Sequence, residues 1–232
     1  SNGTELIVSD GTGGGTMMIK DINPGTPNGV PSLITQGPNG KTFFVARDGT
    51  TSLSPASTNI DNGVELWITD GTTAGTQKVK DVNTYSYYYP TGNSWNNSDS
   101  GIGNLTSCNG LLFFTASDNS YSSSVSWNEL WVSDGTEAGT RMVKDINTTG
   151  TYTLPYTIYS RATGVTVNSG TAVSTGSNPQ NLTCVNNTLF FSADDGTGGG
   201  QQGGDESEDL VHERFPEGEI GRASCRERVS SP

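Results

Sequence analysis

Apolar residues occur in short runs that are separated by turn sequences. Two such runs flank Asn39-Gly40, two more flank Asn109-Gly110, and alternating residues flank the loop 134–139. Asn-Gly between apolar runs is a strong hairpin signal, because both residues accept the positive φ angles of a type I′ turn. The pattern therefore predicts β-hairpins at these three places.

Two sequence elements recur along the chain. The element that begins ELIVSDGT or ELWxxDGT occupies residues 5–23, 65–83 and 129–147. The other element starts at Leu33, Leu105 and Leu182, and where both occur in one repeat it comes first. Since each element is predicted to be a hairpin, one repeat forms a four-stranded antiparallel unit, the size of a propeller blade.

Adjacent phenylalanines mark the second strand of each unit. They are Phe43 and Phe44, Phe113 and Phe114, and Phe190 and Phe191. Neighbouring strand residues point to opposite faces of a sheet, so both faces must be covered. We expect these side chains to form the core between stacked units.

The register of the second hairpin follows from pairing Ser133 with Thr140. The same count sets a glutamate opposite a lysine in every copy: Glu5 with Lys20, Glu65 with Lys80, and Glu129 with Lys144. We predict three cross-strand ion pairs, each contributing at most about 1 kcal/mol.

The repeated motif resembles that of the bacterial ELWxxDGT repeat proteins. Its residues stand at Glu65, Leu66, Trp67, Asp70, Gly71 and Thr72, and again from Glu129 through Trp131 to Thr136. The first copy departs from the pattern, with Ile7 in place of tryptophan. The resemblance implies a secreted or surface-exposed repeat protein of propeller-like fold, and it brings no established catalytic residues.

The repeats divide the chain into successive segments. Residues 1–32 form the second half of a first repeat, 33–104 and 105–181 form two repeats with insertions, and 182–200 begin a fourth. These amount to three units, whereas propellers close with about 4 to 8 blades. We predict an all-β, β-propeller-like fragment of a longer or closed array. Residues 201–232 lack the repeat, and we predict that they are disordered or artefactual.

Composition excludes several classes of function. With 24 acidic and 12 basic residues, the chain would repel a phosphate backbone, so no nucleic-acid partner is predicted. No apolar stretch approaches the roughly 18 residues of a membrane span. Cys108 and Cys184 stand one residue out of step in aligned strands. Because their side chains should then point to opposite sides, we predict no disulfide between them.

Repeated aspartates could serve as ligands or as caps. Asp10, Asp70 and Asp134 follow the ELW strands, but each loop offers one or two carboxylates where calcium needs about 6 to 8 oxygens. We therefore favour turn-capping over calcium. Asp21, Asp81 and Asp145 are interpreted as strand-end caps. No unique pair of carboxylates marks a glycosidase, so neither an enzyme nor a cofactor is predicted.

The repeats differ from one another in their insertions, which occupy residues 48–64, 84–103, 118–128 and 148–181. In a four-stranded meander these fall on the face opposite the short turns. Their aromatic residues form the predicted binding surface: Tyr85, Tyr87, Tyr88, Tyr89, Trp95, Trp127, Tyr152, Tyr156 and Tyr159.

Tyr among Ser, Asn and Gly is typical of adaptable binding surfaces. We therefore predict an extracellular or cell-surface adhesion module that binds polysaccharide or a surface protein. The alternatives are a structural matrix protein with calcium-supported turns and passive loops and, less favoured, an extracellular hydrolase.

Overall fold

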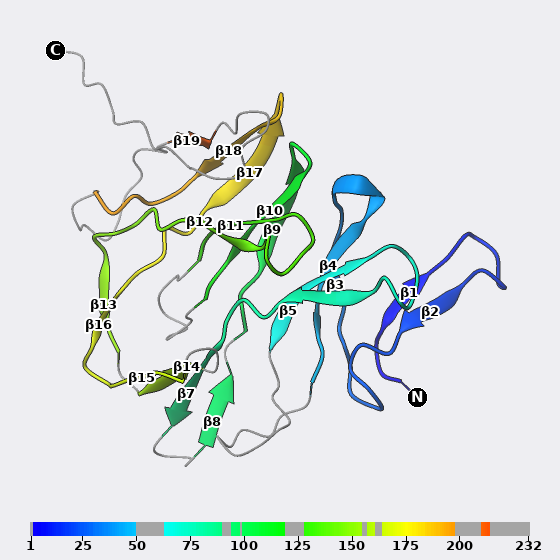
Figure 1. The fold of residues 1–232 in the computed structure, drawn as a ribbon, viewed down its shortest axis with the longest axis horizontal. Coiled ribbons are helices and arrows are strands. Elements are labelled where there is room, and N and C mark those ends of the chain that lie inside the picture. The colour runs from blue at the N-terminus through cyan, green and yellow to red at the C-terminus, as the bar shows by residue number, and fades with distance from the viewer. Residues whose placement is uncertain are drawn as a thin grey trace.

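The described part of the chain is built from β-strands. The computed structural model describes residues 2–49, 63–89, 94–97, 99–118, 128–154, 157–160, 164–197 and 210–213. No α-helix occurs among them, and a search of these residues finds no helix of the length and apolarity that a bilayer crossing needs. The predicted all-β class is confirmed (Figure 1).

Two complete repeats form four-stranded antiparallel sheets in which each strand pairs with the next one along the chain. Sheet 2 contains β3 (Ser32–Gln36), β4 (Thr42–Arg47), β5 (Val64–Thr69) and β6 (Gln77–Lys80). Sheet 3 contains β9 (Gly103–Cys108), β10 (Leu111–Ala116), β11 (Glu129–Ser133) and β12 (Arg141–Lys144). A single turn of 3₁₀-helix, Pro38–Gly40, joins β3 to β4. The four-stranded unit predicted from the two hairpins is therefore correct.

Partial sheets flank these two. Sheet 1 is the pair β1 (Leu6–Val8) and β2 (Met17–Lys20), which hold the third and fourth strand places of a repeat. Sheet 4 contains β17 (Gln180–Val185), β18 (Thr188–Ser192) and β19 (Leu210–Glu213). Residues 210–213 form β19, which pairs with β18 along its length and takes the third strand place. The expectation that residues 201–232 are disordered or artefactual stays a prediction.

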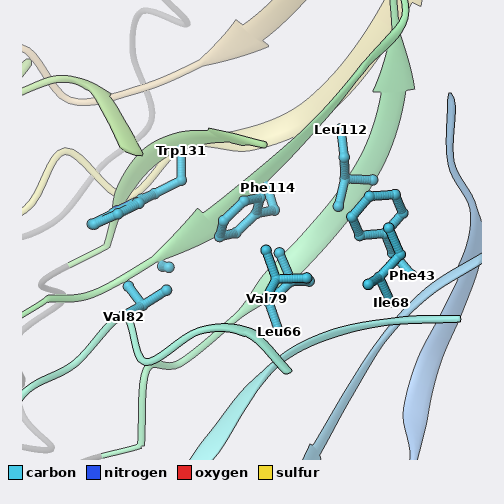
Figure 2. Close-up of a cluster of buried hydrophobic side chains, with 9 residues drawn as sticks. Phe43, Leu66, Ile68, Val79, Val82, Leu112, Phe114 and Trp131 are labelled. Carbon is cyan, nitrogen blue, oxygen red and sulfur yellow. The ribbon is translucent and has the colours of Figure 1, made fainter. Parts of the chain in front are cut away.

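The paired phenylalanines build the core between sheets. Phe43 and Phe114 are both fully buried and belong to one cluster between sheets 2 and 3 (Figure 2). Phe44 faces the other way, into the cluster shared with sheet 1, and Phe113 faces sheet 4, where Phe191 lies. This confirms that adjacent aromatics cover both faces of a sheet.

The tryptophans of the two complete repeats, Trp67 and Trp131, pack against the buried phenylalanines. Trp67 stacks on Phe44 with ring centroids 6.2 Å apart, and Trp131 stacks on Phe114 at 6.3 Å. Each is only 5% exposed.

Neighbouring sheets approach one another most closely at their first strands, β3 with β9 and β9 with β17. The sheets therefore radiate from one edge of the stack, as blades do from a propeller axis. Over the described residues the stack is open.

A disulfide joins Cys108 of sheet 3 to Cys184 of sheet 4, with their Cα atoms 5.4 Å apart. The prediction that these cysteines would not pair is wrong. Their side chains do point to opposite faces of their own sheets, but the sheets are stacked. Cys108 lies on the face of sheet 3 that packs against sheet 4, and Cys184 lies on the face of sheet 4 that packs against sheet 3. The two side chains therefore face each other.

The predicted glutamate–lysine pairs are also wrong. In sheet 2 Lys80 lies opposite Leu66 rather than Glu65, because a bulge between Leu66 and Trp67 shifts the register. The same shift recurs in sheets 1 and 3, where Lys20 lies opposite Leu6 and Lys144 opposite Leu130. The predicted contact of Ser133 with Thr140 is present, with their hydroxyl oxygens 2.7 Å apart.

The lysines connect successive sheets instead. Lys20 Nζ donates to the carbonyl of Thr76 at 2.7 Å, and Lys80 Nζ donates to that of Thr140 at 2.9 Å. Each acceptor closes the DGTxxGT turn of the following repeat. The lysine thus ties one sheet to the turn of the next.

The glutamates hold the two ends of each inter-repeat link, an arrangement we call the Glu clamp. Glu65 accepts a hydrogen bond from Val82 N at 2.8 Å and one from Ser100 Oγ at 2.6 Å. Val82 lies two residues after the end of β6, and Ser100 lies three residues before β9, the first strand of the next sheet. One buried side chain therefore fixes both ends of the segment between them.

The clamp recurs around links of different length. Glu129 binds Ile146 N at 3.4 Å and Ser177 N at 2.7 Å, and Glu5 binds Ile22 N and Gly29 N at 2.9 Å each. The first clamp position is 17 residues from the glutamate in all three copies. The second is 24, 35 or 48 residues away. Links of unequal length thus meet the core at equivalent points.

Burial raises the pKa of two of the clamp glutamates. Desolvation raises the pKa of Glu129 to about 7, although hydrogen bonds from Ser177 oppose this rise. Desolvation also raises the pKa of Glu65 well above its usual range. Below neutral pH the Glu129 carboxyl therefore stays protonated in the folded protein.

Candidate functional site

The DGTxxGT turns are closed by their own aspartates. Asp70 Oδ1 accepts hydrogen bonds from Thr72 N at 3.0 Å and from Thr72 Oγ1 at 2.7 Å, and Gly71 has a φ of +88°. Asp10 with Thr12 and Asp134 with Thr136 form the same contacts. The predicted turn-capping role is confirmed.

These hydrogen bonds favour the charged carboxylates. The Thr72 hydroxyl and N–H lower the pKa of Asp70 to about 2, and the bonds from Thr12 and Thr136 lower the pKa of Asp10 and Asp134. Among the residues that the structure describes, no three His, Cys, Asp or Glu side chains lie together as metal ligands. Calcium at these turns remains the alternative to turn-capping.

The second set of aspartates directly follows β2, β6 and β12. Asp21, Asp81 and Asp145 come one residue after Lys20, Lys80 and Lys144, the last residues of those strands. Asp21 accepts a hydrogen bond from Gly25 N at 3.2 Å, across the turn that starts the first link. This contact fits the predicted strand-end cap at Asp21.

Two of the segments that link successive repeat sheets pair with each other and form an additional sheet. We call it the link sheet, and it has the strand order β15 (Thr166–Val167), β14 (Ile158–Ser160), β7 (Tyr85–Tyr89) and β8 (Ser94–Asn97). Strands β7 and β8 come from the link between sheets 2 and 3, whereas β14 and β15 come from the link between sheets 3 and 4. Figure 1 shows β7 and β8 at the end of the molecule opposite the β9–β10 and β17–β18 turns.

The register divides the tyrosine positions of β7 between the two faces of the link sheet. Ile158 lies opposite Tyr87, and Ser160 lies opposite Tyr85. Residues directly opposite each other share a face, and both Ile158 and Ser160 are only 2% exposed. Positions 85 and 87, and by alternation 89, therefore belong to the covered face.

Three other aromatic positions belong to the opposite face. Tyr88 lies opposite Trp95, and Tyr159 stands between Ile158 and Ser160 on β14. Strand alternation assigns all three positions to the face away from that of Ile158. Positions 88, 95 and 159, which we call the aromatic triplet, come from two different links and share one face of one sheet because β7 pairs with β14.

The other predicted binding residues lie elsewhere. Tyr152 is half-buried and lies opposite Val173, in a separate ribbon formed by β13 (Thr151–Thr153) and β16 (Ala172–Ser174). Trp127 and Tyr156 lie outside the described residues. The predicted binding residues that the structure describes thus fall into three groups: the aromatic triplet, the positions on the covered face of the link sheet, and Tyr152 in the β13–β16 ribbon.

Comparison with known proteins adds no relative, because no family model, no curated protein and no solved structure matches this chain.

Proposed function

We propose that this protein is an extracellular binding or adhesion module that contacts a polysaccharide or a surface protein through the link sheet. The observation that carries the proposal is the aromatic triplet, because two separate links pair and bring positions 88, 95 and 159 to one face. Aromatic side chains stack on the apolar faces of sugars and make large contacts at low entropic cost.

The Glu clamp supports a role for the links beyond connecting sheets. The first link completes its clamp between Ile22 and Gly29, so a short segment is sufficient to join two sheets. The longer links at 84–103 and 148–181 exceed this requirement. We interpret their additional residues as the part of the chain available for recognition.

The disulfide and the repeat support the proposed location. Disulfides form and persist in oxidising compartments, and Cys108 is bonded to Cys184. The motif at Glu65–Thr72 resembles the bacterial ELWxxDGT repeat proteins, and we propose membership of that family together with an extracellular or cell-surface location.

The test compares two sets of alanine variants on a glycan array and in a cell-adhesion assay. The triple variant Tyr88→Ala, Trp95→Ala, Tyr159→Ala should lose binding, while Tyr152→Ala in the β13–β16 ribbon should retain it. Circular dichroism should show the same strand content in both. If the triple variant folds and binds as the unmodified protein does, the link sheet is not the binding surface.

A further inference from the structure

The two links that form the link sheet are nearly free of charge, although the whole chain has a formal net charge of −12. Residues 84–103 and 148–181 contain no lysine, histidine or glutamate, and their charged residues are Asp99 and Arg161. The four strands of the sheet, with the sequences YSYYY, SWNN, IYS and TV, contain neither of these two. The strands of the link sheet therefore present no charged side chain.

The acidic residue of these links is bound to a repeat sheet. Asp99 Oδ1 accepts a hydrogen bond from Arg47 Nη2 at 2.9 Å and another from Val64 N at 3.0 Å. Arg47 ends β4 and Val64 begins β5, so both donors belong to sheet 2. Arg161 lies outside the described residues. Asp99 is therefore part of the contact between its link and the stack.

Small polar residues complete the face of the aromatic triplet. Ser86 lies opposite Asn97 on β8 and opposite Tyr159 on β14. Tyr159 in turn lies opposite Thr166 on β15. Residues directly opposite each other share a face. Thr166 is exposed to solvent, whereas Ile158, on the other face, is buried. The triplet face therefore combines aromatic positions with hydroxyl and amide positions, and at β15 it is accessible.

The aromatic positions are spread across the sheet. Tyr159, Tyr88 and Trp95 stand on the successive strands β14, β7 and β8. Because neighbouring strands are about 4.8 Å apart, the outer two positions are separated by about 10 Å across the sheet. This distance exceeds the length of one pyranose ring. A sugar ligand that contacts all three positions therefore contains several units in a row.

The absence of charge selects a class of ligand. Hydroxyl and amide side chains donate and accept hydrogen bonds, as the hydroxyl groups of sugars do. An anionic polysaccharide would meet no cationic side chain on these strands, and the acidic chain would repel it. Protein interfaces use arginine beside tryptophan and tyrosine at their hot spots, and charged groups fix their orientation. Since the four strands provide no such groups, a neutral sugar polymer fits the face better than either.

We propose that the ligand of the link sheet is a neutral, linear polysaccharide, an inference that rests on the proposed function. The polymer crosses β14, β7 and β8, so that successive sugar units lie over the positions of the aromatic triplet. Positions 86, 97 and 166 contribute polar groups for its hydroxyls. No ion pair takes part in recognition, so the affinity does not depend on ionic strength.

The test is surface plasmon resonance of the full-length chain on immobilised mixed-linkage β-glucan, glucomannan and alginate. At least one of the two neutral polymers should bind with the same Kd at low and high salt, whereas the anionic alginate should not bind. A tetrasaccharide prepared from the bound polymer should compete, and its monosaccharide should not. The triple variant Tyr88→Ala, Trp95→Ala, Tyr159→Ala should weaken binding about tenfold or more, while Tyr152→Ala keeps it.

Three results would overturn the neutral ligand and leave the link sheet as the binding surface. One is binding to alginate, or salt-sensitive binding, that the triple variant loses. Another is cell adhesion that the triple variant loses and that protease treatment of the cells abolishes, because the partner is then a protein. The third is equal competition by the monosaccharide, which would remove the requirement for a polymer.

Two further results separate this inference from the proposed function. If neither neutral polymer and no neutral linear glycan on the array binds, the inference is wrong. If a neutral polymer binds and the triple variant retains that binding in full, both the inference and the proposed function are wrong.

Discussion

The repeat sheets and the link sheet are both antiparallel, but they are specified in different ways. In sheets 2 and 3 each feature recurs at an equivalent position: the phenylalanine pair, the tryptophan, the bulge and the Glu clamp. The link sheet has no internal repeat, and its central pairing joins β7 to β14 from different links. The comparison indicates that the repeat determines the stack, while the inserted residues determine one surface on it.

The Glu clamp is the boundary between these two parts. Because it fixes the ends of each link at equivalent points of the core, the length and sequence of the link between them can vary. We therefore expect substitutions on the core side of the clamp to unfold the stack, and substitutions on the link side to leave it folded.

The largest expected effect is at the core between sheets. Phe114→Ala removes a fully buried ring from the cluster that joins sheets 2 and 3, and it should cost about 3–5 kcal/mol of the free energy of unfolding. Tyr152→Ala, the matched truncation in a link, should cost much less. Urea unfolding measures both, and equal losses would contradict the proposed separation.

The disulfide should come next in size. The variant Cys108→Ser, Cys184→Ser opens a covalent loop whose ends are 76 residues apart and which includes the long third link. The expected loss is about 2–5 kcal/mol. Thermal unfolding with and without reductant measures it, with the double variant as the control that reductant should not affect. An unchanged midpoint for the unmodified chain in reductant would argue against the bond.

Protonation of the clamp predicts a pH dependence. Desolvation raises the pKa of Glu129 from 4.5 to about 7 in the folded chain, so between these values the folded state holds a proton that the unfolded state has lost. The stability from this group is therefore full below pH 4.5 and is lost as the pH rises through 7. Glu65 shifts in the same direction.

Urea unfolding at pH 5 and pH 8 tests this assignment. Glu129→Gln should reduce the difference in unfolding free energy between the two pH values, while Glu137→Gln, at an exposed turn position, should leave it unchanged. If Glu129→Gln keeps the full difference, another group causes the pH dependence.

The smallest predicted effect concerns one backbone position that is equivalent in the first strands of the repeat sheets, β3, β9 and β17. Leu33, Asn104 and Asn181 occupy equivalent bulged positions with φ values of +51°, +53° and +59°. Asparagine tolerates this left-handed conformation better than leucine, and Leu33 is 47% exposed. Leu33→Asn should therefore stabilise the chain by about 1 kcal/mol. Thermal unfolding should show a higher midpoint for Leu33→Asn and a lower one for Asn104→Leu. A fall in the midpoint of Leu33→Asn would show that the repeats are not equivalent here.

Repetition explains which parts of the fold could be predicted. The phenylalanine pairs and the DGTxxGT turns depend on local spacing, which recurs in three copies. In the strands this spacing determines which face of the sheet each side chain occupies. The predicted glutamate–lysine pairing is wrong because a bulge shifts the register by one residue, and neither of the paired strands, Val64–Thr69 and Gln77–Lys80, contains a glycine or proline to indicate it. Strand alternation correctly places the two cysteines on opposite faces of their own sheets, but only the stacking of sheets 3 and 4 brings those faces together.

The candidate site was less predictable than the stack. The tyrosine-rich link suggested a surface, yet the aromatic triplet depends on pairing between residues 85–87 and 158–160. No local pattern encodes contact between segments so far apart, and neither segment belongs to the repeat. The clamp partners Ser100 and Ser177 were missed for the same reason, because they lie 35 and 48 residues from their glutamates.

Shortening both long links tests the central claim most directly. In this variant residues 84–99 and 148–176 are each replaced by Pro-Gly-Thr-Pro-Asn, the sequence of residues 24–28 that completes the first clamp. If the clamp separates core from link, the variant should unfold cooperatively in urea. Its free energy of unfolding should then lie within about 1 kcal/mol of the original, since shorter loops change closure entropy only slowly. Loss of cooperative unfolding, or destabilisation by several kcal/mol, would show that the link sheet is part of the core.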